Sequence, residues 1–127
     1  MILADTSIWI DHLRVTDETM AAWLDAGAIL VHPFVVGELA MGNLQGRARI
    51  LPTLRQMPTP IKARDAEVWE LIEREKLSGL GLGFIDAHLL ASTLLTDEAT
   101  LWTRDRRLHA AAERLGLAAI TTSRTSR

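Results

Sequence analysis

The chain contains no cysteine among its 127 residues. This absence excludes a disulfide framework, a zinc site with thiolate ligands and a cysteine nucleophile. Proline and glycine are also scarce, at 4 and 8 residues, so the composition is not that of a disordered or fibrous protein. The longest stretch without Asp, Glu, Lys or Arg, residues 26–37, has 12 residues, whereas a membrane-spanning helix needs about 20. We therefore expect no contact with a membrane.

The beginning of the sequence is not that of a secretory signal peptide. Its short apolar start is not preceded by basic residues and is followed at once by Asp5. We therefore expect a cytoplasmic protein, in agreement with the lack of cysteine.

The length and charge of the chain favour one ordinary globular domain. With 48% hydrophobic and 24% charged residues, we expect a single domain over residues 1–120, followed by a polar tail at 121–127. Lys and Arg number 14 against 16 Asp and Glu, which gives a net charge of -2. This balance excludes a protein that binds nucleic acid through bulk positive charge. Any contact with nucleic acid must be local or bridged by metal cations.

Short apolar runs alternate with helical patterns along the chain. The runs predict strands at 2–4, 28–31, 100–103 and 117–120. Helical spacing, caps and glycine stops predict helices at 7–14, 17–26, 33–43, 65–77, 84–96 and 105–115, and two helical pieces over 47–57, because Pro52 cannot continue the hydrogen-bond ladder. We expect an α/β fold, a three-layer α/β/α sandwich with a central, mostly parallel sheet.

Four acidic residues occupy unusual positions. Asp5 and Asp105 follow the first and third predicted strands, and parallel sheets bind their ligands beyond the carboxyl ends of strands. Glu38 and Asp86 lie in apolar helical segments, where we expect little water around them. A buried carboxylate must be protonated, paired or bound to a cation, and neither segment contains Lys or Arg. Because all the donors are oxygens, the pattern favours Mg²⁺ or Mn²⁺ over zinc.

Each of these acids also has a structural explanation. Asp5 and Asp105 could serve only as N-caps of the helices that follow them. Glu38 and Asp86 are harder to explain in this way, because Asp and Glu are rarely buried without a partner. Taken together, the four acids favour a metal site over four separate structural roles.

The residues around these acids resemble a known family, the PIN-domain ribonucleases, and within it the VapC-type toxins of toxin-antitoxin pairs. The resemblance covers nearly the whole chain, from Met1 to about Ile120. It is carried by four motifs in the family's order, which read ILADTSIWID from position 2, VVGEL from 35, LGLGFIDAHLLA from 80 and LWTRDRRL from 101. Each motif is weak alone, but four in order are specific.

The resemblance implies a PIN-like fold and a metal-dependent endoribonuclease. In it, Asp5, Glu38, Asp86 and Asp105 would form the catalytic, metal-binding quartet, assisted by a hydroxyl of Thr6 or Ser7. The expected cofactor is Mg²⁺, with Mn²⁺ as a substitute, and a metal-activated water would hydrolyse the RNA phosphodiester bond. The expected partners are an RNA substrate, a cognate antitoxin protein and a second copy of the chain in a homodimer.

Arginines near the fourth acid suggest how RNA would be held. Arg104, Arg106 and Arg107 flank Asp105 at the start of a predicted helix, where positive charge is unfavourable against the helix dipole. Arginine binds phosphate oxygens in a bidentate manner, so we expect these three residues, together with Arg14, to bind RNA phosphates. The alternative is a solvated helix end.

Two other functional classes compete with the nuclease. A phosphoacceptor signalling domain would need paired acids after its first strand and a lysine near its end, and the chain has neither. A non-catalytic RNA- or protein-binding module on the same scaffold stays open, because the sequence alone does not separate it from an enzyme.

Overall fold

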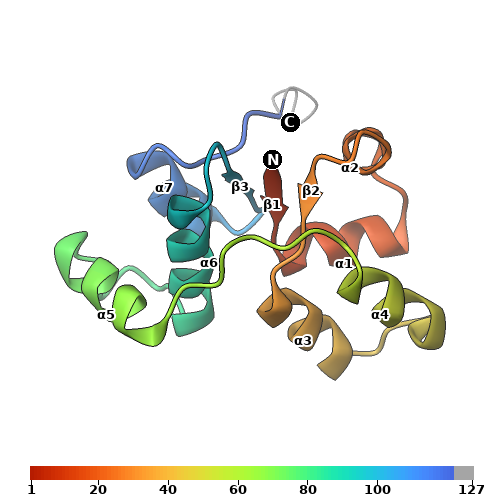
Figure 1. The fold of residues 1–127 in the computed structure, drawn as a ribbon, viewed down its shortest axis with the longest axis horizontal. Coiled ribbons are helices and arrows are strands. Elements are labelled where there is room, and N and C mark those ends of the chain that lie inside the picture. The colour runs from red at the N-terminus through yellow and green to blue at the C-terminus, as the bar shows by residue number, and fades with distance from the viewer. Residues whose placement is uncertain (122–127) are drawn as a thin grey trace.

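A computed structural model describes residues 1–121 of the chain (Figure 1). In chain order, the elements are β1 (Ile2–Ala4), α1 (Thr6–Arg14), α2 (Glu18–Asp25), β2 (Ile29–Leu30), α3 (Pro33–Met41), α4 (Arg47–Arg55), α5 (Asp65–Arg74), α6 (Phe84–Leu95), β3 (Thr100–Trp102) and α7 (Arg106–Arg114). None of these helices is both long and apolar enough to cross a membrane. Apart from Thr121, the predicted tail lies outside the described residues.

The three strands form a parallel sheet in the order β2-β1-β3. In Figure 1, helices α1 to α4 lie to the right of the strands and below them, and α5 to α7 lie to the left. Leu3 of β1 pairs with Leu30 and Leu101 in the neighbouring strands, and all three side chains are buried. Apolar strands with helices on both sides confirm the predicted α/β sandwich.

The sheet register fixes where the first and fourth acids lie. Ala4 at the end of β1 is the partner of Trp102 at the end of β3. The backbone N–H of Asp5 then donates to the carbonyl of Trp102, at 3.1 Å. Because the two strands are parallel neighbours, the residues that follow them share one edge of the sheet.

Two predicted elements differ from the structure. The strand expected at 117–120 is reduced to a single bridge between Leu101 and Ala118. The two helical pieces expected over 47–57 are one helix, α4, with Pro52 inside it. Pro52 removes one backbone donor, but Leu51 and Leu54 on either side of it are buried, and their packing keeps the helix continuous.

A buried histidine begins the helix that carries Glu38. The Nδ1 atom of His32 accepts the N–H of Phe34 at 2.9 Å and so caps α3. Its proton therefore lies on Nε2, which donates to the hydroxyl of Ser92 on α6 at 3.1 Å. His32 is fully buried. Burial, together with the charges of His88 and Lys62, lowers the pKa of His32 to about 4.

This lowered pKa predicts a loss of stability in acid. The unfolded chain binds a proton on His32 near pH 6.5, whereas the folded chain resists it, so the free energy of unfolding falls as the pH drops from about 6.5 to 4. Relative to His32→Asn, which keeps a capping oxygen, wild type should lose up to about 3 kcal/mol over this range. Urea denaturation at several pH values measures the difference. His109→Asn, at a partly exposed position of α7, is the control, and parallel profiles for wild type and His32→Asn would contradict the account.

Candidate active site

Asp5 is held at the junction of β1 and α1. It is 6% exposed and caps α1 by accepting the N–H of Ile8 at 3.3 Å. Its carboxylate also accepts the hydroxyl of Ser7, at 2.6 Å, and that of Thr103. Burial raises the pKa of Asp5, and these hydrogen bonds act in the opposite direction. Asp5 is therefore both a cap and a carboxylate that is costly to ionise.

Asp105 caps α7 on the neighbouring strand end. One carboxylate oxygen accepts the N–H of Leu108 at 2.9 Å, and the side chain is exposed. The backbone N–H of Asp105 donates to Oγ1 of Thr103 at 3.0 Å. The buried hydroxyl of Thr103 thus joins Asp5 to the turn that carries Asp105. The sequence analysis missed Thr103, although a hydroxyl at a strand end, two residues before an acid, was a signal for this role.

Glu38 lies on α3 and accepts a hydrogen bond from the hydroxyl of Thr6, the residue after Asp5. Contrary to the prediction, it is exposed. The apolar neighbours Val35, Val36 and Leu39 face the core, whereas Gly37 and Glu38 face outward. A helix rotates about 100° per residue, so an apolar neighbourhood in sequence does not bury every member.

Asp86 lies in the first turn of α6, where its carboxylate accepts the N–H of Gly83 at 3.0 Å. It is half-buried. Burial is the main cause that raises the pKa of Asp86, and the negative charges of Asp105 and Glu38 raise it further. Residues from α3, α6 and the start of α7 therefore act on one another electrostatically across the carboxyl edge of the sheet.

The donors suit a divalent cation, but they do not form a closed cage. Within residues 1–121, none of the four carboxylates has an ion pair with Lys or Arg. Contrary to the tight cluster expected from the sequence, no three His, Asp or Glu side chains in this part of the chain converge closely enough to hold one ion. Mg²⁺ keeps several of its waters and takes only one or two protein carboxylates, so a loose, all-oxygen arrangement fits it. The negative charges of Asp105 and Glu38, which raise the pKa of Asp86, would also attract such a cation.

The four candidate phosphate-binding arginines differ in their surroundings. Arg106 and Arg107 are exposed, and the Arg107 side chain lies so close to Gly81 that an added Cβ would come within 2.6 Å of its Cδ. Arg14 and Glu38 both line a groove of about 450 Å³, whose apolar floor includes Leu13 and Leu39. These three arginines have no ion pair among the described residues.

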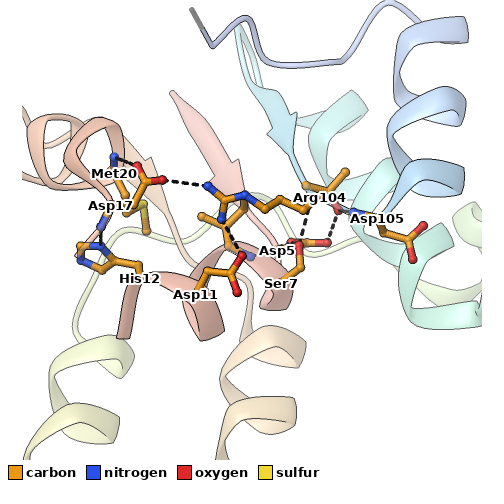
Figure 2. Close-up of polar contacts among 10 residues, drawn as sticks. Asp5, Ser7, Asp11, His12, Asp17, Met20, Arg104 and Asp105 are labelled. Atoms are coloured by element: carbon orange, nitrogen blue, oxygen red, sulfur yellow. Dashed lines mark hydrogen bonds and ion pairs between the residues drawn. The ribbon is translucent and has the colours of Figure 1, made fainter. Parts of the chain in front are cut away.

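Arg104 does not match its predicted role. Its guanidinium forms ion pairs with Asp11 at 3.1 Å and Asp17 at 2.8 Å, and its side chain is 25% exposed. Figure 2 shows the guanidinium pointing away from Asp5 and Asp105, toward α1 and α2. Both of its terminal nitrogens contact protein carboxylates, which compete with a phosphate for the same guanidinium.

The raised pKa of Asp86 predicts how the charge of this residue affects the free energy of unfolding of the metal-free protein, which is prepared in EDTA. A carboxyl whose folded-state pKa is raised destabilises the fold when ionised, and this effect disappears as the pH falls through that pKa. Asp86→Asn should therefore be more stable than wild type by about 0.5 kcal/mol at pH 7, a small gain because solvent screens the half-exposed group. The gain should vanish below about pH 4. Chemical denaturation at both pH values, with Asp97→Asn just beyond α6 as control, measures it; lower stability of Asp86→Asn at pH 7 would contradict the account.

Comparison with known proteins agrees with this geometry. The family model described as PIN domain matches residues 2–114. The curated protein "Ribonuclease VapC32" of Mycobacterium tuberculosis, from strains CDC 1551 / Oshkosh and ATCC 25618 / H37Rv, is 44% identical over 119 residues, which cover 93% of this chain and 95% of the relative. Both findings confirm the resemblance seen in the sequence motifs. The chain belongs to the PIN-domain family, among its VapC proteins.

Proposed function

We propose that the chain is a Mg²⁺-dependent endoribonuclease and the toxin of a toxin-antitoxin pair. One observation carries the proposal: four carboxylates that have no cationic partner within residues 1–121 lie around one edge of the sheet, and the charges of Asp105 and Glu38 raise the pKa of Asp86. The similarity to a curated ribonuclease over 93% of the chain supports an RNA substrate. A phosphodiester is an anion, so it needs a bridging cation to approach such a site.

The chain's own residues have distinct tasks in this proposal. Asp5, Glu38, Asp86 and Asp105 would hold Mg²⁺, or Mn²⁺ in its place, through their carboxylate oxygens directly or through the waters that the ion keeps. When bound, the cation supplies positive charge to the phosphate oxygens and lowers the pKa of water. Hydroxyls that donate to the carboxylates fix their directions: Ser7 and Thr103 orient Asp5, and Thr6 orients Glu38. Hydrolysis by water leaves a 5′ phosphate and a 3′ hydroxyl.

The proposal also includes the partners that a toxin of this family requires. We propose a cognate antitoxin protein, a homodimer and a cytoplasmic location. Large apolar side chains at the molecular surface support a protein partner: Met41 is 88% exposed, and Ile10, which lines the groove next to Glu38, is 48% exposed.

A substitution of Asp86 tests the enzymatic activity directly. Asp86→Asn removes a charge but keeps the size of the side chain, and we expect it to lower the rate of RNA cleavage by about 100-fold or more, with RNA binding retained. Asp97→Asn, exposed beyond the other end of α6, should cleave like wild type. EDTA should stop cleavage and added Mg²⁺ should restore it. Undiminished cleavage in EDTA, or a cyclic phosphate at the new RNA end, would contradict the proposal.

A salt titration tests the RNA-binding arginines. Arg106 and Arg107 are exposed beside Asp105 and have no ion pairs in the described part of the chain, so we propose that they bind RNA phosphates. The double variant Arg106→Ala with Arg107→Ala should bind RNA more weakly, and the slope of log affinity against log salt should fall by about 0.7 for each lost contact with a single strand. Arg47→Ala with Arg55→Ala, on α4, is the control. An unchanged slope would remove both arginines from the RNA-binding surface.

A further inference from the structure

Arg104 stands at the centre of a network that links three parts of the fold. It lies between β3 and α7, one residue before Asp105. One guanidinium nitrogen contacts Asp11 on α1, and the other contacts Asp17, the N-cap of α2 (Figure 2). The guanidinium also lies over the ring of Trp102, 5.6 Å from its centroid. The side chain thus ties the turn after β3 to two helices that are distant from it in sequence.

Both carboxylates that hold Arg104 lie on fixed elements. Asp17 uses its other carboxylate oxygen to accept the N–H of Met20 at 2.8 Å, and its backbone N–H donates to Nδ1 of His12 at 3.1 Å. Asp11 is part of the regular helix α1. Asp17 therefore gives the guanidinium a defined place through a carboxylate that is held by a backbone hydrogen bond, and Asp11 does so through the fixed backbone of α1.

The backbone of the same turn reaches two members of the acidic quartet. The N–H of Arg104 donates to the Ser7 hydroxyl at 3.0 Å, and this hydroxyl donates to Asp5. On either side of Arg104, Thr103 donates to Asp5 and the N–H of Asp105 donates to Thr103. Displacement of the turn would move the hydrogen-bond donors of Asp5 and the backbone of Asp105 together.

The charges explain why this arginine can lie next to the acidic site without neutralising it. Asp11 and Asp17 bring two negative charges to one guanidinium, so the three residues together carry no positive charge that would offset the quartet. Only arginine offers a planar fork that reaches two carboxylates at once, whereas lysine carries a single point charge.

We propose that Arg104 is a positioning residue for the nuclease site, which it fixes through the ion pairs with Asp11 and Asp17. It sets the β3–α7 turn and, through that turn, Asp105 and Asp5. This inference rests on the proposed function, and it replaces the phosphate-binding role that the sequence suggested for Arg104.

Steady-state kinetics separate positioning from phosphate binding. The variants are Arg104→Lys and the double variant Asp11→Asn with Asp17→Asn, in which Asn keeps the cap of α2. A misplaced site should lower kcat by about tenfold or more, with KM for RNA within about twofold of wild type. Loss of a phosphate contact would instead raise KM at unchanged kcat. Arg55→Lys and Asp25→Asn, exposed residues outside the network, should behave like wild type.

Amide hydrogen exchange on the metal-free protein gives a second readout that needs neither RNA nor cation. In the β3–α7 turn, the N–H of Arg104 donates to the hydroxyl of Ser7 on α1, and the N–H of Asp105 donates to the hydroxyl of Thr103. In Arg104→Lys and in the double variant Asp11→Asn with Asp17→Asn, both N–H groups should exchange about tenfold faster or more, while the N–H of buried Leu90 on α6 keeps its wild-type rate. If the wild-type protein cleaves no RNA, the proposed function is overturned, but the exchange comparison still tests whether Arg104 positions the turn. Unchanged exchange in both variants, or a raised KM at wild-type kcat, overturns the positioning role.

Discussion

Repulsion among carboxylates at one edge of a parallel sheet is the constraint on which the candidate site depends. Strands β1 and β3 are neighbours and run in the same direction, so the residues after them meet. Asp86 and Glu38 reach the same region from α6 and α3, and the pKa of Asp86 is raised by burial and by both neighbouring acids. The fold opposes this repulsion with packing elsewhere, in particular the fully buried Leu3, Leu90 and Leu101. A cation bound among these carboxylates would relieve the repulsion, as the proposed function requires.

Local helix capping and the geometry of the site are the same interactions in this protein. Asp5, Asp86 and Asp105 each accept a backbone N–H at the beginning of a helix, so their positions follow from helix formation itself. Hydroxyls then fix the directions of the carboxylates, as Thr103 does for Asp5. The two explanations offered for the acids by the sequence, as caps and as metal ligands, are therefore compatible.

The sequence predicted the parts of the structure that depend on short-range patterns. Apolar runs in the sequence predicted β1, β2 and β3. The rule that ligands bind beyond the carboxyl ends of parallel strands predicted that Asp5 and Asp105 lie at one edge of the sheet. The predictions from sequence failed for features that depend on packing between segments distant in the chain. The exposure of Glu38 depends on which side of α3 faces the core, and the partners of Arg104 lie about 90 residues away, on α1 and at the start of α2. Continuity of α4 through Pro52 likewise depends on burial of its neighbours.

The most direct test of the central claim is a crystal structure of the protein soaked in Mn²⁺, with the ion located by its anomalous scattering. The account predicts a peak at the carboxyl edge of the sheet, bound by oxygens of Asp5, Glu38, Asp86 or Asp105 and by waters. A soaked crystal with no peak there would contradict the account, and so would a structure in which the four carboxylates are bound to arginine side chains.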